Sequence, residues 1–508
     1  MKTVSAETMR RLDAGTIRSG YRSGMELMSR AGQAVAEAVI AHFPGNDPVA
    51  ILAGKGNNGG DGFIVADLLV KTGRPVRLFT AVSPQELRGD ALTAFYRMTD
   101  SPLLERFCVC TPEALSGCGV IVDAMLGTGF SGVPRAPFAE WIAMVNHSGI
   151  PVIAVDIPSG VTADDGSVTG EAVTADLTVT FGLPKAGLLT GEGLSRAGRI
   201  KVAEIGLSPA LLEQAESLLE VTTAEDIRHC FGREPVTTYK NSRGHVLVIG
   251  GSRWYTGAPF LSGIGALHTG SGLVTVAVPE SLQSDCRVPG SLMIHRCNDE
   301  GKGYFTAESL NDLSGLLEKA QAVAIGPGMS TGTGLDDVLA ELIPTVKVPL
   351  VLDADALNVL SFRQNARQAL TERRAVTVLT PHEGEMNRLL PVGGTREDRA
   401  KRLAAEMNVY VVLKGPRSIV AAPSGACYYN LSGCTALATA GSGDVLTGIL
   451  ASLLGRGIDP LTAVRAGVYL HGLTGELAAP LPGSGRGVTA DRLLEEIVPA
   501  MRTISPFA

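Results

Sequence analysis

The sequence predicts an α/β protein with two domains, each built around a mainly parallel β-sheet. At 508 residues the chain is too long for one hydrophobic core, because cores stop growing at roughly 250 to 300 residues. Short β-branched runs alternate with amphipathic stretches twice along the chain, which is typical of parallel strands joined by crossover helices. This pattern lapses around residues 207–235, so we place the domains at 1–218 and 219–508.

Five short apolar runs are the candidate strands of the first domain. They are PVAILAG, PVRLFTAV, GVIVDAML, PVIAVD and DLTVTFG. The stretch MELMSRAGQAVAEAVIAHF before them has apolar residues at helical spacing and no proline, so it should be a helix that packs on the sheet. The opening segment is expected to be helical too. These elements predict three layers, with helices on both faces of a parallel sheet.

The second domain repeats the alternation with six further runs. They are HVLVIGG, GLVTVAVPE, QAVAIGPG, PLVLDADAL, AVTVLTP and VYVVLKG, followed by a helical block from residue 441 onward. In this block one apolar stripe is formed by Val445, Leu446, Ile449, Leu450, Leu453 and Leu454. Such a stripe predicts a helix that is buried against the sheet.

Composition limits the classes of partner. Apolar residues are 45% of the chain and charged residues 19%, as in ordinary folded proteins. The formal net charge of -7 gives no electrostatic footprint for nucleic acid or for an anionic membrane, so we expect neither as a partner. We predict a cytoplasmic location, because no apolar run reaches the ~18 residues of a membrane span. No CxxC pair occurs among the cysteines at 108, 110, 118, 230, 286, 297, 427 and 434.

A glycine-rich loop follows the first predicted strand. The segment GKGNNGGDG at residues 54–62 lies between PVAILA and the helical stretch FIVADLLVKTG. In this arrangement backbone amides and the helix dipole can hold a phosphate. The loop has neither GxGxxG nor GxxxxGK[ST], so it is not one of the common nucleotide fingerprints. A tight turn does not need three polar side chains, so Asn57, Asn58 and Asp61 favour a ligand site.

Two more strands of the first domain end at aspartates. Asp123 ends GVIVDAML and precedes the glycine-rich residues 127–132, and Asp156 ends PVIAVD with Ser159 close behind. One such aspartate alone would more often be a helix cap. Ligands of open parallel sheets bind at the carboxyl ends of the strands, so three polar loops there predict a single site.

The motifs of the first half are similar to those of a known family. GKGNNGGDG, DAMLGTG, DIPSG and TVTFGLPKAG, with MELMSRAG upstream, resemble the epimerase domain of the NAD(P)H-hydrate repair enzymes, in the same order. The resemblance implies a Rossmann-like fold, and a potassium ion held by Asn58, Asp123 and Ser159, whose oxygens suit a hard cation. Asp156 would contact the nicotinamide ring and act as the acid or base. The residues implied to bind the hydrated dinucleotide are Asn57, Asn58, Gly59, Gly60, Asp61, Gly127, Thr128, Gly129, Phe130, Ser131, Gly132, Val133 and Asp156.

In the second half the segment TAGSGD, residues 439–444, runs directly into the predicted buried helix. Asp444 should therefore lie in the first turn of that helix. Glycines before a helix can bind an anion, and a carboxylate there can take the proton of a hydroxyl that attacks phosphate. An aspartate that merely caps the helix has the same local pattern. A functional site is favoured by the further strand-end segments GG (250–251), YTGA (255–258), GPG (326–328), PHEGE (381–385) and KG (414–415).

GSGD, DADALN, PHEGE, LKG and GPG together resemble the ribokinase-like fold and, within it, the nucleotide-dependent NAD(P)H-hydrate dehydratases. By this resemblance Asp444 contacts the hydroxyl of the hydrate and helps to phosphorylate it, after which phosphate departs and the double bond returns. The nucleotide phosphates imply Mg²⁺, with Glu385 as a candidate near the ion. The hydrate would be bound by Ala258, Gly328, His382 and Asp444. The nucleotide would be bound by Lys414, Gly415, Pro416, Arg417, Ser418 and Gly443.

Together the two resemblances imply a bifunctional, homo-oligomeric repair enzyme. It would interconvert the R and S epimers of hydrated NAD(P)H and dehydrate the S epimer with ADP, releasing AMP and phosphate. Two alternatives stay open. Vitamin and sugar kinases share the same fold and the GxGD motif, and fold does not fix function. The first half could also be a binding or regulatory module without turnover.

Overall fold

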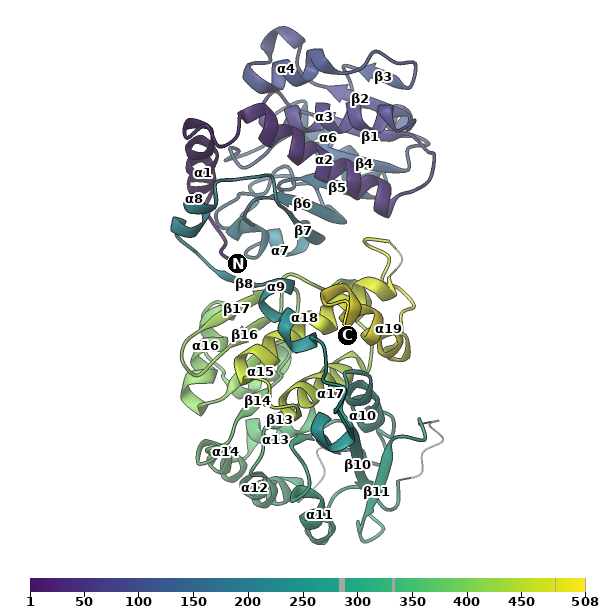
Figure 1. Cartoon of the computed structure of the whole chain (residues 1–508), viewed down its shortest axis with the longest axis vertical. Helices are drawn as coiled ribbons and strands as arrows, with labels where there is room; N and C mark the ends of the chain where they lie inside the picture. Colours follow the sequence, from purple (N-terminus) through teal and green to yellow (C-terminus); the bar gives the residue numbers. More distant parts are fainter. Residues whose placement is uncertain (283–287, 331–333, 480, 508) are drawn as a thin grey trace. The chain divides into compact units, whose positions relative to one another are not determined.

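The computed structural model describes residues 1–282, 288–330, 334–479 and 481–507, so Cys286 lies outside the described residues. The chain divides into two compact units (Figure 1). The first comprises Met1–Val221 with Leu481–Ser484, and the second comprises Thr222–Pro480 with Gly485–Ala508. Within the described ranges, no helix is both long and apolar enough to cross a membrane.

The first unit contains a seven-stranded sheet. Its strands are β1 (Val49–Ala53), β2 (Val76–Thr80), β3 (Leu104–Phe107), β4 (Val120–Ala124), β5 (Val152–Val155), β6 (Leu177–Phe181) and β7 (Arg199–Ala203). They lie in the order β3-β2-β1-β4-β5-β6-β7, and every neighbouring pair is parallel. The five predicted runs form β1, β2, β4, β5 and β6. The edge strands β3 and β7 were not predicted, because their sequences LERF and RIKVA place charged residues between the apolar ones.

Helices cover both faces of this sheet, which confirms the predicted three layers (Figure 1). The helices are α1 (Ala6–Arg18), α2 (Gly24–His42), α3 (Asn57–Lys71), α4 (Gly89–Arg97), α5 (Pro112–Leu115), α6 (Phe138–His147), α7 (Gly193–Arg196) and α8 (Pro209–Gln214). The predicted α2 begins at a capping box in which Ser23 and Glu26 bond each other's backbone N–H groups. One core cluster packs α2 and α3 on the sheet, and another packs α5 and α6 around Trp141.

The second unit is built on a ten-stranded sheet, whose edge strand β8 (Glu220–Thr222) begins two residues before that unit does. Its strands are β8 (Glu220–Thr222), β9 (His245–Ile249), β10 (Leu273–Pro279), β11 (Met293–Cys297), β12 (Ala322–Ile325), β13 (Leu350–Leu352), β14 (Thr377–Leu379), β15 (Tyr410–Leu413), β16 (Ile419–Ala421) and β17 (Cys427–Asn430). The order is β11-β10-β9-β12-β13-β14-β15-β16-β17-β8. The strands from β11 to β15 are parallel, whereas β15, β16 and β17 pair antiparallel. The six predicted runs form the parallel centre, and the four strands that the patterns missed lie towards the two edges.

The helices of the second unit complete an α/β fold. They are α9 (Ala224–Ile227), α10 (Ala258–His268), α11 (Ser309–Leu317), α12 (Leu335–Thr345), α13 (Asp355–Phe362), α14 (Gln364–Thr371), α15 (Glu383–Leu389), α16 (Arg396–Met407), α17 (Ser442–Gly455), α18 (Pro460–Ala478) and α19 (Ala490–Ile504). A core cluster packs α10, α17, α18 and α19 against alternate residues of β9, β10 and β12. The predicted apolar stripe lies on α17 and is buried throughout.

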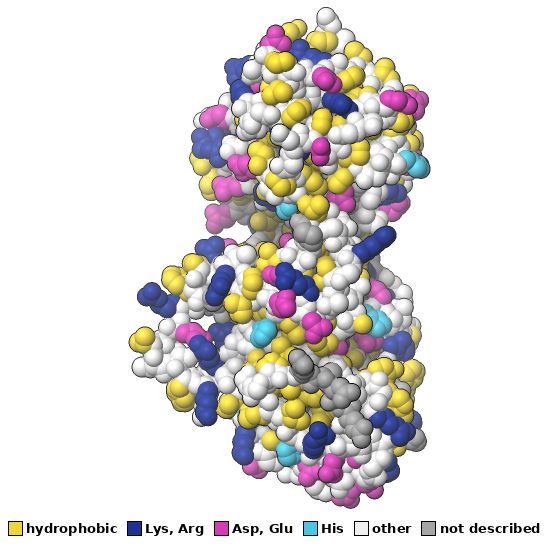
Figure 2. Space-filling view, turned by 90° about the vertical axis from the view of Figure 1, so that its right-hand side faces the viewer, with side chains coloured by type: hydrophobic (Ala, Val, Ile, Leu, Met, Phe, Trp, Pro, Cys, Tyr) yellow, Lys and Arg dark blue, Asp and Glu magenta, His cyan; other side chains and the backbone are white. Residues whose placement is uncertain are grey.

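The surface mixes charges of both signs. On the face shown in Figure 2, Lys and Arg side chains are interspersed with Asp and Glu side chains over the described residues. An anionic ligand is therefore not attracted by a broad basic surface on that face, and local groups must hold it.

Candidate active sites

The first candidate site lies where the strand order of the seven-stranded sheet reverses. β1 and β4 are neighbours, and the chain continues from them in opposite directions, to β2 and to β5. Ligands of open α/β sheets bind at such a point. The loops after the two strands nearly touch, since a Cβ on Gly54 would lie 2.0 Å from the carbonyl oxygen of Met125. A Cβ on Gly127 would lie 3.1 Å from the Cβ of Asn58. Glycine at position 54 permits this close approach.

The N-terminus of α3 presents backbone N–H groups at this point. The helix begins at Asn57, and its N-cap residue Gly56 makes no side-chain capping bond. The first N–H groups of a helix have no partner within the helix, so an anion can accept hydrogen bonds from them. The second predicted loop, residues 127–133, follows β4 and ends at Val133, which is exposed.

Oxygen-bearing groups from three loops meet beside this helix start. The Ser159 hydroxyl donates to Asp123 Oδ1 at 2.6 Å, and the Ser159 N–H donates to Asp123 Oδ2 at 2.8 Å. Asn58 Nδ2 donates to the Leu126 carbonyl oxygen at 3.2 Å, and the Leu126 N–H donates to Ser159 Oγ at 2.9 Å. Burial raises the pKa of Asp123 to about 6, although the bonds from Ser159 and Met125 act in the opposite direction. The three side chains predicted to hold potassium are thus linked by hydrogen bonds, with Asn58 joined to the other two through the Leu126 backbone.

Asp156 follows β5 in a strained backbone conformation, with a φ of 65° that a residue other than glycine seldom adopts. Its Oδ1 accepts hydrogen bonds from Thr180 Oγ1 at 3.1 Å, from the Phe181 N–H at 3.1 Å and from Lys185 Nζ at 2.5 Å. Lys185 is completely buried and also donates to Thr180 Oγ1 at 3.2 Å and to the Phe181 carbonyl at 3.0 Å. The structure therefore holds Asp156 in a hydrogen-bonded, buried ion pair.

Two further carboxyl groups interact electrostatically with this ion pair. Burial raises the pKa of Asp61, in α3, well above its ordinary value, and the charges of Asp156 and Asp13 add to the effect. Burial also raises the pKa of Asp13, in α1, to about 6, with an opposing effect of Lys185. Sequence reasoning named Asp61 and Asp156 but missed Lys185 and Asp13. Lys185 lies in the quoted motif TVTFGLPKAG just after a strand, so the strand-end argument could have found it.

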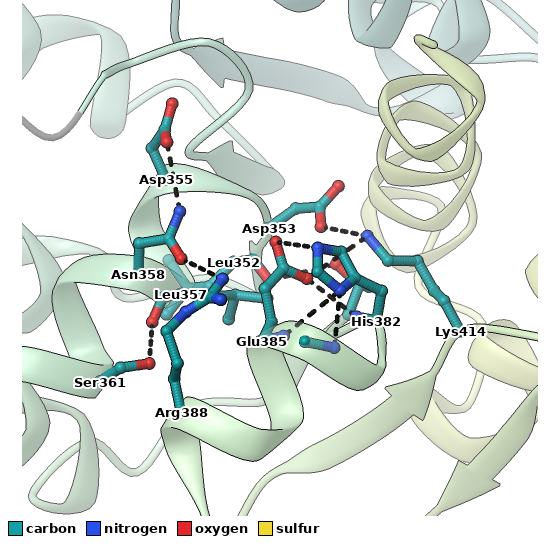
Figure 3. A network of polar contacts seen from close by, with 12 residues as sticks. Leu352, Asp353, Asp355, Leu357, Asn358, Ser361, His382, Glu385, Arg388 and Lys414 are labelled. Carbon is teal, nitrogen blue, oxygen red and sulfur yellow. Dashed lines mark hydrogen bonds and ion pairs between the residues drawn. The ribbon is translucent and has the colours of Figure 1, made fainter. Parts of the chain in front are cut away.

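The second candidate site is centred on Asp353, which sequence reasoning did not name. Asp353 follows β13, and its Oδ1 accepts a hydrogen bond from Lys414 Nζ at 2.7 Å (Figure 3). Its Oδ2 accepts one from Thr447 Oγ1 at 2.7 Å. Burial acts to raise the pKa of Asp353, but Lys414 and the hydroxyls of Thr447 and Thr380 bring it below the ordinary value. A Cβ on Gly443 would lie 3.4 Å from Lys414 Nζ, which places that glycine beside the ion pair.

Asp444 lies in the first turn of α17, as predicted. The preceding Gly441 has a left-handed φ of 87°, and Ser262 of α10 donates a hydrogen bond to the Asp444 carbonyl at 2.8 Å. The Asp444 carboxyl makes no hydrogen bond to the described residues. Burial, together with the charge of Asp353 and against the opposing charge of Lys414, raises the pKa of Asp444 to about 7. A carboxyl that titrates near neutral pH can act as a general base.

His382 and Glu385 stand beside Lys414 (Figure 3). His382 is the N-cap of α15, and its Nδ1 accepts hydrogen bonds from the N–H groups of Gly384 at 3.0 Å and Glu385 at 3.3 Å. Glu385 Oε2 accepts one from the His382 N–H at 2.8 Å and lies 4.0 Å from Lys414 Nζ. Part of the role of His382 is therefore structural, but its side chain is 55% exposed, which leaves the ring accessible to a ligand.

The remaining predicted residues lie at the start of α10 and on two loops. Ala258 begins α10, four residues before the Ser262 that bonds Asp444, and a Cβ on Gly328 would lie 3.2 Å from the Ala258 Cβ. Residues 414–418 connect β15 to β16. In this loop Ser418 Oγ donates to the Gly415 carbonyl at 3.1 Å. The structure thus brings Lys414, Gly443, His382 and Asp444 together around Asp353.

Comparisons with known proteins match both halves of the chain. Residues 24–187 match the family model described as YjeF-related protein N-terminus, and residues 246–499 match that described as NAD(P)H-hydrate dehydratase. The chain is 38% identical to the bifunctional NAD(P)H-hydrate repair enzyme Nnr of Moorella thermoacetica, over 99% of this chain and 97% of that protein. The Escherichia coli protein of the same name is 33% identical, over 95% of this chain and 90% of the relative. A crystal structure of ADP/ATP-dependent NAD(P)H-hydrate dehydratase from Bacillus subtilis, co-crystallised with ATP and Mg²⁺, is 27% identical with a TM-score of 0.48, over 57% of this chain and 99% of that one.

Proposed function

The chain belongs to the bifunctional NAD(P)H-hydrate repair enzymes, and from this premise we propose which residues carry each of its two activities. The enzyme interconverts the R and S epimers of hydrated NAD(P)H and dehydrates the S epimer at the expense of ADP. We assign epimerisation to residues 1–218 and dehydration to residues 219–508. The observation that carries the second assignment is the half-buried Asp444 carboxyl beside the Asp353–Lys414 ion pair.

In the epimerase domain, Asn57 to Asp61 and Gly127 to Val133 bind the hydrated dinucleotide. The open N–H groups at the start of α3 support this assignment, because they suit its phosphates. Asp156 contacts the nicotinamide ring and moves the proton that epimerisation requires. Its fixed position supports this role, since three hydrogen bonds hold one carboxylate oxygen.

A potassium ion fits the oxygen atoms near Asp123. Asn58, Asp123 and Ser159 would hold it, and the Leu126 carbonyl lies among them. Carboxylate, hydroxyl, amide and carbonyl oxygens are the ligands that hard cations take. When bound, the ion would supply a positive charge beside the buried Asp123 carboxylate and near the phosphates of the dinucleotide.

In the dehydratase domain, Ala258, Gly328 and His382 bind the hydrate. Asp444 takes the proton of its hydroxyl, whose oxygen then attacks the terminal phosphate of ADP while AMP leaves. The carbon–oxygen bond then breaks and phosphate leaves. The neighbouring carbon loses a proton, and the ring double bond returns. Water is a poor leaving group and phosphate a good one, which explains why a nucleotide is consumed.

The nucleotide is bound by the loop of Lys414, Gly415, Pro416, Arg417 and Ser418 together with Gly443. Mg²⁺ would accompany it and neutralise charge on its phosphates. Within the described residues, no group of three or more His, Cys, Asp or Glu side chains is placed to hold a metal by itself. Mg²⁺ is commonly held by one or two carboxylates and the substrate phosphates, and Glu385, whose Oε2 lies 4.0 Å from Lys414 Nζ, is the candidate near the ion. The preference for ADP, the homo-oligomer and the cytoplasmic location stay predictions.

The test supplies both epimers of NADH hydrate with Mg²⁺, with and without ADP. The absorbance of reduced nicotinamide and the release of phosphate are followed together. We expect complete, ADP-dependent recovery of both epimers, with one phosphate released per NADH. Recovery of one epimer only would make the first half a binding module. A stable phosphorylated product without NADH would indicate a kinase instead.

A further inference from the structure

Four ionisable groups, three of them buried, interact electrostatically in the epimerase domain, and we call them the charge cluster. They are Asp13 of α1, Asp61 of α3, Asp156 after β5 and Lys185 after β6. The mechanism proposed above uses only Asp156 as a proton carrier. Lys185 belongs to the motif TVTFGLPKAG, to which no role has been assigned so far.

The cluster holds one positive charge against three groups that become negative on ionisation. Burial and repulsion between carboxylates favour the protonated form of at least one of them, and both act on Asp61. The hydrogen bonds decide which one is ionised, because Lys185 Nζ lies 2.5 Å from Asp156 Oδ1. Asp61 is 8% exposed, and its carboxyl makes no hydrogen bond to the described residues. The ammonium therefore stabilises the charge on Asp156, and the proton stays on Asp61.

We propose that Asp61 is the acid that works with Asp156 as the base, and that Lys185 is the positioning residue that keeps Asp156 ionised. This inference rests on the proposed epimerase function and assigns its two proton-transferring groups. Enzymes commonly assign the acid and the base in this way, by environments that keep one carboxyl protonated and its neighbour ionised.

The hydrated carbon carries a hydroxyl and is bonded to the ring nitrogen, so the step balances without a further reactant. Asp156 takes the hydroxyl proton, the carbon–oxygen bond becomes a carbonyl, and the carbon–nitrogen bond breaks. Its electron pair stays on nitrogen, which receives the proton of Asp61. Rotation about the adjacent carbon–carbon bond presents the other face of the carbonyl to the nitrogen. Ring closure then returns one proton to Asp61 and the other from Asp156 to oxygen.

The N-terminal segment completes the cluster, although the matched family model begins only at residue 24. Val4 pairs with the backbone beside Lys185, since its N–H donates to the Pro184 carbonyl at 3.0 Å and its carbonyl accepts from the Ala186 N–H at 3.2 Å. Helix α1 starts two residues later and carries Asp13, whose negative charge favours the protonated form of Asp61. Asp13 thus acts on the reaction through Asp61.

The experiment measures interconversion of purified epimers by chromatography, without ADP and across pH, using the full chain. Asp61→Asn has the same shape but no acidic proton, and we expect it to lower kcat by about 10²- to 10⁴-fold. Asp67→Asn is the matched control, because Asp67 lies on the same helix but bonds Lys71 and Thr99. This control should keep the wild-type rate.

The pH profile separates positioning from mere structural support. Lys185→Met removes the ammonium that bonds Asp156, so kcat should fall, and Lys185→Arg should restore it in part. In Asp13→Asn the basic limb should move to lower pH, because Asp61 then loses its proton more readily. An Asp61→Asn or Lys185→Met enzyme at the wild-type rate, or an Asp13→Asn profile that does not move, would overturn the inference. If the wild type does not interconvert the epimers, the proposed function itself fails.

Discussion

Each half of the chain places a lysine beside a buried aspartate at a strand end, but the two lysines contact aspartates with different roles. In the epimerase domain Lys185 bonds Asp156, the carboxylate proposed to react. In the dehydratase domain Lys414 bonds Asp353, whereas the proposed base Asp444 makes no such bond to the described residues. In the epimerase site the lysine therefore holds Asp156, the residue proposed to react. In the dehydratase site it holds Asp353, which is a neighbour of the proposed base Asp444.

The difference shows how placement alone can set the protonation of a buried carboxyl. Contact with a lysine stabilises the carboxylate, as the lowered pKa of Asp353 illustrates despite its burial. Without such contact, burial raises the pKa of Asp444 to about 7, and the charge of Asp353 adds to that effect. Asp444 can thus accept and release a proton near neutral pH, while Asp353 keeps its charge and holds Lys414 in place.

Removal of the unpaired carboxyl should have the largest effect. Asp444→Asn is expected to lower kcat for dehydration by about 10²- to 10⁴-fold, because the amide cannot take the hydroxyl proton. Interconversion of the epimers should not change in the same protein. Both are measured on one sample, by NADH absorbance with ADP and by chromatography without it. Asp491→Asn, at the exposed start of α19, is the control. A normal dehydration rate in Asp444→Asn would exclude Asp444 as the base.

The second largest effect is expected from breaking the Asp353–Lys414 ion pair. Asp353→Asn leaves the Lys414 ammonium without its closest anion, which typically costs about 3 kcal/mol in a buried pair. Thr447→Val removes one hydrogen bond to the same carboxylate and should cost about 1 kcal/mol. Urea unfolding gives the two free energies, and titration calorimetry gives the affinity for ADP. Equal losses in both variants would mean that the ion pair contributes no more than the hydroxyl does.

The pH dependence of dehydration should follow Asp444. A base must be ionised, so kcat/KM should fall about tenfold per pH unit below the pKa of about 7. The negative charge of Asp353 contributes to that raised pKa, so the acid limb should move to lower pH in Asp353→Asn. Steady-state rates from pH 5 to 9 measure both. An acid limb that stays in place would show that Asp353 does not set the protonation of Asp444.

The smallest effect is expected at the proposed potassium site. Ser159→Ala removes one oxygen and its bond to Asp123, which should weaken potassium binding by about tenfold, or about 1.4 kcal/mol. Thermal shifts in KCl and in NaCl at equal ionic strength would measure it, with Ser167→Ala on an exposed turn as the control. An equal response of the wild type to both salts would contradict a selective potassium site.

The parallel centre of each sheet could be predicted from the sequence, because those strands are apolar runs buried on both faces. The missed strands lie towards the edges, where charged residues interrupt the pattern, as Glu105 and Arg106 do in β3, or where the strand is only three or four residues long, as in β16 and β17. Among the site residues, Asp353 ends a predicted strand just as Asp123 does, so the strand-end argument could have included it. Asp13 gives no such signal, because it lies on an amphipathic helix and only the fold brings it near Asp61.

The close approach of the loops after β1 and β4 also determines how these positions tolerate change. At Gly54 any side chain meets the Met125 carbonyl, so even alanine requires the backbone to move, whereas at Gly56 an added Cβ meets nothing within 4 Å. Gly54 and Gly56, two positions apart in the same loop, should therefore tolerate substitution very differently over evolution. Position 54 is constrained by space alone, whatever the chemistry of the ligand, and position 56 is free to vary in size.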